Sequence, residues 1–158
     1  MPSPKRGQSR GPLRNGAALG CTAALALLLA SCSSTVALDL KTGDCLELPD
    51  DTDLQAGFEI TSVRTVACSE SHDAQVIGEK ELDGAEYPGE AVIQEIADEF
   101  CVTEFENFTG VPLSQSALDV FPLIPTEESW DKAEDRTLLC IAVNMTKQVT
   151  DTFESQAE

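Results

Sequence analysis

The sequence predicts a small α+β domain, with a largely antiparallel sheet, one main helix packed on it, and two disulfides that staple it. Three observations predict this class. Residues 90–108 carry apolar side chains at helical spacing. Several short stretches rich in Val, Ile and Thr are separated by turn residues, as in strands of a sheet. Four cysteines are spread widely through the same part of the chain.

The first 31 residues have the features of a signal peptide. Four basic residues and no acidic residue accompany an uncharged run, residues 17–30, that is rich in Ala and Leu. This run is shorter than the roughly 20 residues with which a helix crosses a bilayer, and its length suits the apolar part of a secretory signal. A short buried helix of a cytosolic domain is the alternative, and the basic residues before it disfavour that interpretation.

The signal ends in Leu29-Ala30-Ser31-Cys32, which has the form of a lipobox: an aliphatic residue, two small residues and a cysteine. We expect cleavage before Cys32 and lipidation of its thiol, with two or more acyl chains for firm attachment. The protein would then be held on the extracytoplasmic face of the cell membrane, with residues 32–38 as a short tether. Ordinary signal cleavage after Ala37 is the alternative, since Thr35-Val36-Ala37 also has small residues.

The chain after the signal is strongly acidic. Removal of residues 1–31 from the 158 leaves 127 residues, a length for one domain with one core. All 28 acidic residues but only six of the ten basic ones remain, so the formal charge is near −22. Such a surface repels nucleic acid, and because the acidic residues are spread along the chain, its plain interpretation is solubility.

A calcium-binding loop is a more specific explanation of the acidic residues than solubility, but the sequence does not fit such a loop. The run Asp50-Asp51-Thr52-Asp53 suggests an EF-hand loop. With Asp51 as the first position, however, Ala56 stands where the loop needs Gly, and Ser62 stands where it needs Glu. We therefore expect no metal and no other cofactor.

The cysteines predict disulfides. Two disulfides are indicated, because the predicted extracytoplasmic part of the chain has an even number of cysteines after Cys32: Cys45, Cys68, Cys101 and Cys140. A zinc site would need closely spaced pairs, and no two of these cysteines are closer than 23 positions. Three pairings are possible, and their order along the chain favours Cys45 with Cys68 and Cys101 with Cys140.

The local patterns predict the elements of a domain at residues 39–146. Residues 38–48 contain a turn or the start of a strand, and residues 49–57 form a surface loop. Strands are expected at 58–68, at 74–80 with Gln75 and Glu79 as the polar side, at 117–123 and at 137–145. A helical turn begins after Pro125 with Thr126 as its N-cap. Residues 147–158 are expected to be a polar, flexible tail.

The main helix is predicted at residues 90–108. Its apolar face would consist of Val92, Ile93, Ile96, Ala97 and Phe100, with Cys101 at the edge of this face. Gly110 and Pro112 would end it. A bridge from Cys101 to Cys140 would fasten the strand at 137–145 to this helix.

Three motifs resemble a known family. Residues 40–45 resemble the L-x-x-G-D-C opening of the actinobacterial septum formation domain. Residues 66–76 resemble its V-x-C-x-x-P-H-D-x-E-V motif, with Ser71 and Gln75 in place of Pro and Glu, and residues 125–140 resemble its closing P-T-x-x-x-W…C segment. The motif residues are Gly43, Asp44, Cys45, Cys68, His72, Asp73, Trp130, Arg136 and Cys140. The resemblance implies a secreted or membrane-tethered protein linked to cell division, and no defined activity.

The motif residues are expected to be structural rather than catalytic. His72 is the only histidine, the cysteines are expected to be oxidised, and no G-x-S-x-G nucleophile motif exists. His72 and Asp73 would shape the turn after Cys68, and Trp130 would cover the core. We therefore expect a non-enzymatic module at the cell surface that binds an envelope protein or a cell-wall component. The alternative is a metal-dependent enzyme, or a protein that binds calcium or a small ligand, using His72 and nearby carboxylates.

Overall fold

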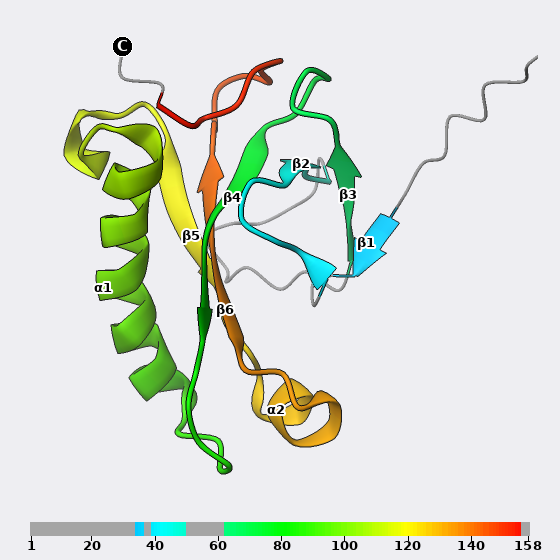
Figure 1. The fold of residues 1–158 in the computed structure, drawn as a ribbon, viewed down its shortest axis with the longest axis vertical. Helices are drawn as coiled ribbons and strands as arrows, with labels where there is room; N and C mark the ends of the chain where they lie inside the picture. The colour runs from blue at the N-terminus through cyan, green and yellow to red at the C-terminus, as the bar shows by residue number, and fades with distance from the viewer. Residues whose placement is uncertain (1–33, 37–38, 50–61, 156–158) are drawn as a thin grey trace, which may run out of the picture. The chain divides into compact units, whose positions relative to one another are not determined.

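The computed structural model describes residues 34–36, 39–49 and 62–155, so the predicted signal peptide, Cys32 and residues 50–57 of the loop predicted at 49–57 lie outside the described residues. Figure 1 shows the elements in chain order. They are the strands β1 (Ser34–Val36), β2 (Cys45–Glu47), β3 (Ser62–Val66) and β4 (Ala74–Glu81), the helix α1 (Glu90–Thr109), the 3-10 turn η2 (Leu113–Gln115), the strand β5 (Asp119–Leu123), the helix α2 (Glu127–Ala133) and the strand β6 (Thr137–Val143).

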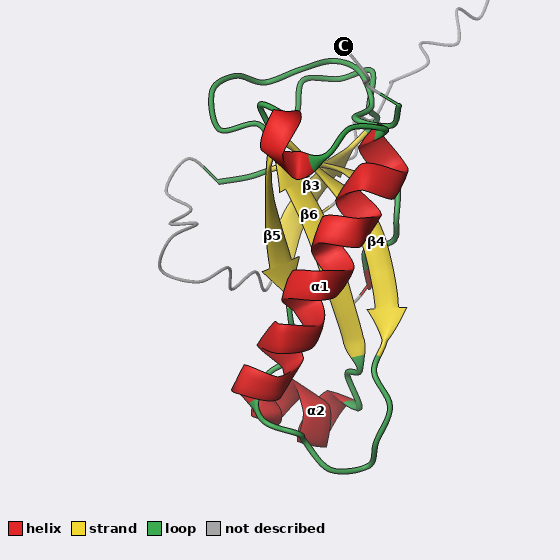
Figure 2. Cartoon of the chain, turned by 90° about the vertical axis from the view of Figure 1, so that its left-hand side faces the viewer, coloured by secondary structure: helices red, strands yellow, loops and turns green. Residues whose placement is uncertain are grey.

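The strands form one antiparallel sheet in the order β1-β3-β2-β4-β6-β5. The helix α1 packs on β4, β5 and β6, and Figure 2 shows it lying across that face of the sheet. The prediction of a small α+β fold with one main helix on a largely antiparallel sheet is therefore confirmed. Within the described part of the chain, no helix is long and apolar enough to cross a membrane.

The helix α1 begins and ends within one residue of its predicted bounds, but its buried face is placed differently. The buried residues recur at every fourth position: Ile93, Ala97, Cys101, Phe105 and Thr109. Val92 was predicted on this face and is 48% exposed, so that prediction is wrong. Cys101 lies within the buried face and not at its edge. A row of every fourth residue winds slowly around a helix, and contact along such a row places Val92 on the solvent side.

Strand β4 contains a bulge that puts two residues in succession on the α1 side of the sheet. The register with β6 shifts between Val76 and Gly78. Val76 belongs to the core on the far side of the sheet, and the next residue, Ile77, belongs to the core beneath α1. Gly78 also faces α1, where a Cβ atom would lie 2.9 Å from the Cβ of Glu104. The bulge therefore interrupts the alternation of β4 side chains between the two faces of the sheet. The residues after it face the opposite side of the sheet from the one that strict alternation with the residues before it would give.

The sheet has a hydrophobic core on each face. Strand β6 contributes to both cores, because successive residues of a strand point to opposite faces of the sheet. The core beneath α1 includes Ile77, Ile93, Ala97, Cys101, Phe105, Trp130, Leu138, Cys140, Ala142 and Phe153. The core on the other face includes Leu40, Leu46, Leu48, Val63, Ala74, Val76, Leu139, Ile141 and Val143. Met145, predicted as the last residue of this strand, lies beyond it and is 51% exposed.

The helix α2 begins as the sequence predicts. Thr126 is its N-cap, and the Thr126 and Ser129 side chains each accept a hydrogen bond from the other residue's backbone, which forms a capping box. The cap orients α2 so that Trp130 is buried beneath it. The Trp130 indole donates to the Ala85 carbonyl at 3.3 Å, and the Arg136 guanidinium lies 3.8 Å from the ring centre.

Both ends of the domain differ from the prediction. Ser34, Thr35 and Val36, assigned to a tether, form β1 and pair with β3. Residues 149–155, part of the flexible tail predicted at 147–158, pack on the domain: Phe153 is buried and its amide donates to Gln75 of β4, and the Ser155 amide donates to the Phe108 carbonyl of α1. Local polarity suggested free segments at both ends, whereas long-range backbone pairing and one aromatic residue hold them in place.

Candidate functional site

The first motif forms a tight turn that leads into β2. The Asp44 amide donates to the Lys41 carbonyl, and Gly43 between them has φ +100°. A positive φ at this position is typical of a type II turn and favours glycine. The Asp44 carboxylate accepts a hydrogen bond from the Lys41 amide at 2.9 Å, which holds the turn closed. The Gly43 amide then donates to the Val76 carbonyl, so the turn is fixed to β4.

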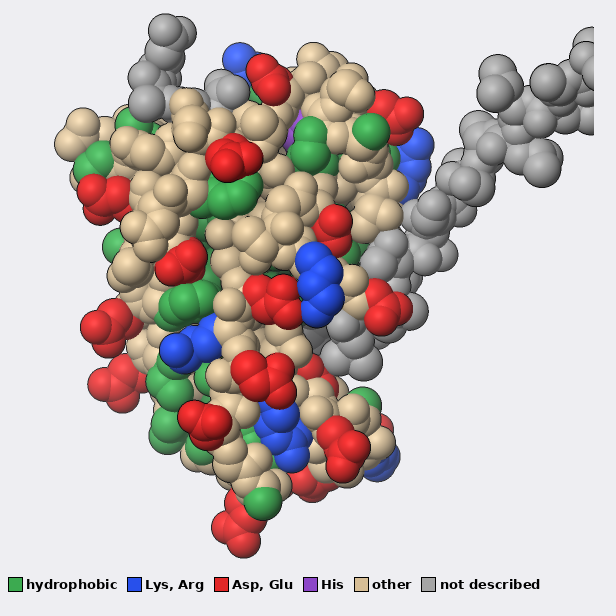
Figure 3. All heavy atoms as spheres, viewed as in Figure 1, with side chains coloured by type: hydrophobic (Ala, Val, Ile, Leu, Met, Phe, Trp, Pro, Cys, Tyr) green, Lys and Arg blue, Asp and Glu red, His purple; other side chains and the backbone are tan. Residues whose placement is uncertain are grey.

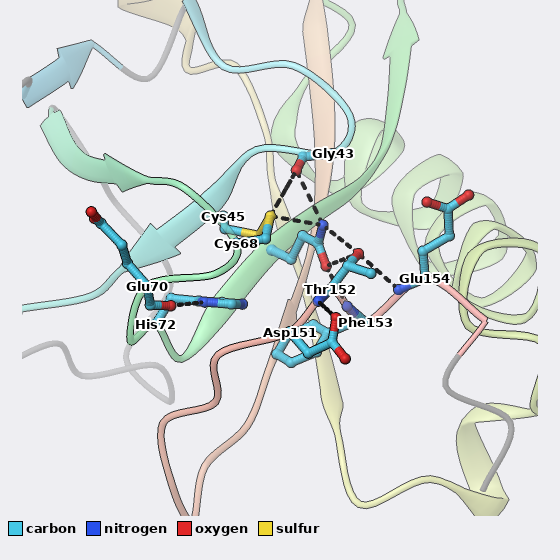
Figure 4. Close-up of a disulfide and its surroundings, with 10 residues drawn as sticks. Gly43, Cys45, Cys68, Glu70, His72, Asp151, Thr152, Phe153 and Glu154 are labelled. Carbon is cyan, nitrogen blue, oxygen red and sulfur yellow. Dashed lines mark hydrogen bonds between the residues drawn. A yellow bond between two sulfur atoms is a disulfide. The ribbon is translucent and has the colours of Figure 1, made fainter.

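The Cys45–Cys68 disulfide joins this turn to the second motif. Its Cα atoms are 5.3 Å apart, and its sulfurs lie within 4 Å of the Gly43 carbonyl oxygen (Figure 4). Cys45 is buried and Cys68 is partly exposed. The other pair in the structure is Cys101 with Cys140, so both disulfides have the pairing that chain order favours.

Gln75 lies beside this disulfide and joins three segments. The prediction that Gln75 and Glu79 form the polar side of one strand is wrong, because the bulge between them puts them on opposite faces. Gln75 is opposite Ala142, which belongs to the core beneath α1, and Glu79 is opposite Leu139, which belongs to the other core. Gln75 is 2% exposed.

The amide group of Gln75 uses both its ends. Its Nε2 donates to the Gly43 carbonyl at 3.1 Å and to Thr152 Oγ1 at 3.0 Å. Its Oε1 accepts a hydrogen bond from the Phe153 amide at 2.6 Å, and it lies 3.2 Å from Thr152 Oγ1. This single side chain therefore connects the Gly43 turn to Thr152 and Phe153, which Figure 4 labels near the disulfide. The amide can do this because it both donates and accepts.

His72 is fully buried between the second motif and the C-terminal segment. Its Nδ1 lies 2.8 Å from the Glu70 carbonyl oxygen, and its ring centre is 5.7 Å from that of Phe153. Its backbone exchanges two hydrogen bonds with Val149. Its Nε2 is the one buried side-chain nitrogen or oxygen without a hydrogen-bond partner among the described residues. The ring therefore contacts the backbone of the turn through Nδ1, whereas Nε2 is buried.

Asp73 connects the strands around the motifs through backbone groups. Its carboxylate accepts a hydrogen bond from the Leu48 amide at 2.9 Å. Its own amide donates to the Leu46 carbonyl, and its carbonyl accepts from the Asn144 amide. The side chain that follows the histidine in the motif therefore binds the chain just after β2.

The sequence alone did not identify Thr152 and Phe153 as part of this cluster. Phe153 is the one aromatic residue in an otherwise polar stretch after residue 147, and that contrast is the signal available in the sequence. The motif residue Trp130 does not join the cluster. It contacts Ala85, Tyr87 and Arg136 instead. The motifs therefore build two structural centres, one with Trp130 and one with Phe153, and both residues belong to the core beneath α1.

Two ionisable groups near these centres have altered pKa values. A hydrogen bond to the Glu79 carboxylate, together with its negative charge, raises the pKa of Lys41 above its ordinary value. The two groups form an exposed ion pair of 2.8 Å. Partial burial raises the pKa of Tyr87, and the nearby Glu90 and Glu127 add to the effect. Both shifts hold the charge state that these groups already have at neutral pH.

The residues around His72 enclose its side chain. A general base must reach the proton that it takes, directly or through one water, and the described residues leave His72 with no exposed surface. Within the described ranges, no three His, Cys, Asp or Glu residues are grouped so that they could hold a metal ion. The chemistry that the cluster supports is the fastening of backbone segments.

The comparisons with known proteins assign the chain to a family. The family model described as Septum formation matches residues 41–157, about three quarters of the chain. This range begins within the Gly43 turn and includes Phe153, so it contains both structural centres. No curated relative and no solved structure matches the chain. The chain belongs to the Septum formation family.

Proposed function

We propose that this protein is a non-enzymatic lipoprotein of the cell envelope that acts as a binding or accessory module in septum formation. The observation that carries the proposal is the position of the motif residues. Cys45, His72 and Gln75 are buried, Gln75 donates a hydrogen bond to the Gly43 carbonyl, and a disulfide joins Cys45 to Cys68. Residues in such positions maintain the shape of a domain, and a surface elsewhere on the domain would bind the partner.

The state of the cysteines supports a non-catalytic role. Nucleophilic catalysis by cysteine needs a free thiolate. Cys45, Cys68, Cys101 and Cys140 are all paired in disulfides. His72, the single histidine, is enclosed and hydrogen-bonded to a backbone carbonyl. The disulfides and the burial of His72 support a role for these side chains in the fold.

The lipobox supports attachment to the outer face of the cell membrane, and the disulfides support the same address, because they persist in oxidising compartments. The proposed partners are the membrane, through the lipid on Cys32, and an envelope protein or cell-wall component. Figure 3 shows Asp and Glu side chains scattered over the face in view, with Lys and Arg between them. Such a surface keeps an anchored domain soluble and disfavours nucleic acid.

The anchor is tested with Cys32→Ser. The wild-type protein should enter the detergent phase on phase partitioning, and mass spectrometry should find acyl groups on the peptide that begins at Cys32. Cys32→Ser protein should move to the aqueous phase. Retention of the variant in the detergent phase would refute the anchor, and Cys21→Ser is the matched control because this cysteine is expected to leave with the signal.

The division role is tested in cells. A photo-reactive amino acid at an exposed position such as Glu99 or Asp131 should cross-link the protein to a discrete envelope partner. A strain without the protein should form misplaced or delayed septa, and the wild-type gene should correct this. Normal septa in that strain would refute the division role. Metal bound stoichiometrically to purified wild-type protein and lost in His72→Ala, at equal stability, would instead favour the metal-dependent alternative.

A further inference from the structure

The position of the anchor relative to the sheet indicates which side of the domain faces the membrane. We propose that the sheet edge formed by β1 and β3 lies against the phospholipid headgroups, and that α1 faces away from the bilayer. This inference rests on the proposed lipid anchor at Cys32. Three observations support it: the short connection between anchor and sheet, the position of α1 relative to β1, and the distribution of charge.

The connection between the anchor and the folded domain is very short. Strand β1 begins at Ser34, two residues after Cys32. Two residues reach at most about 7 Å when fully extended. The headgroup region of one leaflet is about 5–7 Å thick, from the difference between total and hydrocarbon thickness. The first residue of β1 must therefore lie at the outer boundary of the headgroups.

Strand β1 pairs with β3 in the sheet. If β1 lies at the membrane, β3 must therefore lie next to the membrane as well. It pairs with β3 over all three of its residues, with Ser34 opposite Arg64 and Val36 opposite Ser62. Because the pairing is antiparallel, the chain enters the sheet from the side on which β3 ends, near Ala67. Residue 67 is exposed and is therefore a suitable position for a label that reports on the membrane.

The helix α1 lies far from this edge. Strand β1 is at one edge of the sheet and β5 is at the other, five strand spacings away. With about 4.8 Å between neighbouring strands, the two edges are about 24 Å apart along the sheet. The helix packs on β4, β5 and β6, in the half of the sheet that is distant from β1. Figure 1 shows α1 and β1 on opposite sides of the domain.

The charges favour the same orientation. The helix α1 has six acidic residues and no Lys or Arg, so an anionic bilayer repels it. Arg64 on β3 is directly opposite Ser34, and its side chain is 49% exposed and paired with Glu47. This guanidinium can exchange its carboxylate partner for a lipid phosphate, which has the geometry that arginine binds well. The edge nearest the anchor therefore carries the Arg64–Glu47 ion pair, whereas α1 carries acidic residues that no Lys or Arg of the helix balances.

The test measures how close two positions lie to the lipid headgroups. Lipidated protein is purified from its own membranes, and mass spectrometry first verifies the lipid on Cys32. A fluorescent amino acid is incorporated at Ala67 or at Glu99, which is exposed on α1. The protein is reconstituted in phosphatidylcholine vesicles whose headgroups carry a spin label. We expect strong quenching at 67 and no quenching at 99; equal quenching at the two positions would overturn the inference.

A variant with a longer tether distinguishes attachment through the lipid from orientation of the domain by a short connection. Insertion of 12 Gly and Ser residues between Ser33 and Ser34 gives a connection with a root-mean-square length of about 19 Å. The quenching at 67 should then fall to the level at 99, and unchanged quenching would contradict orientation by a short connection. Absence of lipid on Cys32 would refute the proposed function, whereas lipid with equal quenching would refute only the orientation.

Arg64→Gln tests the contact with phosphate, and Lys132→Gln is its control, since Lys132 is also exposed and ion-paired. Addition of phosphatidylglycerol to the vesicles should increase the difference in quenching between positions 67 and 99. Arg64→Gln should reduce this increase and Lys132→Gln should not. An equal reduction in both variants would contradict a specific role for the edge cation.

Discussion

Replacing Gln75 with Leu should destabilise the domain through the C-terminal segment. The leucine side chain is close in size to glutamine but leaves the Gly43 carbonyl and the Phe153 amide without their partners. An unpaired buried polar group costs about 1–3 kcal/mol. Two such groups, offset by the apolar contacts of leucine, give a loss of about 2–4 kcal/mol in the free energy of unfolding. The loss in the free energy of unfolding cannot exceed the free energy with which residues 149–155 bind to the rest of the domain. If the cost were larger, these residues would detach.

The assay is thermal unfolding followed by circular dichroism, with the disulfides intact. For a domain of this size, 1 kcal/mol shifts the melting temperature by about 3–5 °C, so Gln75→Leu should lower it by about 6–20 °C. Gln94→Leu is the matched control, because Gln94 makes one exposed hydrogen bond to Asp98. Its effect should stay within about 0.5 kcal/mol. Hydrogen exchange should show that the Phe153 amide loses protection in Gln75→Leu alone.

Gln75→Glu adds a pH dependence to the same test. A carboxyl buried beside the Gly43 carbonyl is harder to ionise, so its pKa in the folded state rises above the ordinary value of about 4.3. The protonated carboxyl group can still donate to the Gly43 carbonyl. The variant therefore keeps its free energy of unfolding at low pH and loses part of it as the pH rises through the raised pKa. The gap in melting temperature from wild type should widen from about pH 5 to about pH 8. A melting temperature of Gln75→Leu equal to that of Gln94→Leu, or a gap for Gln75→Glu that does not depend on pH, would refute the role assigned to Gln75.

Three further predictions concern the rest of the fold. His72→Ala should lower the free energy of unfolding by about 2–4 kcal/mol, because it leaves a cavity beside Phe153, and His72→Gln should lose less; equal losses in chemical denaturation would contradict a hydrogen-bonding role for the ring. The Cys45–Cys68 disulfide, with one partly exposed cysteine, should be reduced before the fully buried Cys101–Cys140 disulfide, and mass spectrometry of alkylated peptides after graded reduction would reveal the opposite order. Gly78→Ala should cost about 1–3 kcal/mol through overlap with the Glu104 side chain, and an unchanged melting temperature would show that α1 shifts freely.

Patterns confined to one element were predictable from the sequence. The bounds of α1, the alternation along β6 and the Thr126 cap each depend on residues close together in the chain. The chain-order disulfide pairing is also the one found, and it fastens β6 to α1. Local signals of this kind are sufficient to predict the fold class.

Features that depend on distant segments were not predictable. Gln75 resembles a solvent-facing strand residue, and its burial is caused by a bulge and by residues 152–153, more than 70 positions later. The three residues of β1 have too little local pattern to be recognised as a strand, and their pairing with β3 decides their structure. The motifs indicated which residues matter around His72, whereas the contact with the C-terminal segment depends on tertiary packing that no local pattern encodes.

The position of Phe153 in the core has a consequence for the biogenesis of the protein. Phe153 comes later in the chain than every other buried residue of the core beneath α1, including those of β6. A nascent chain therefore lacks part of this core until residue 153 has left the ribosome. For the export proposed above, this order would be favourable, because a chain that folds late remains extended enough for passage through a membrane channel. The complete fold, with its disulfides, would then form only after residue 153 has crossed.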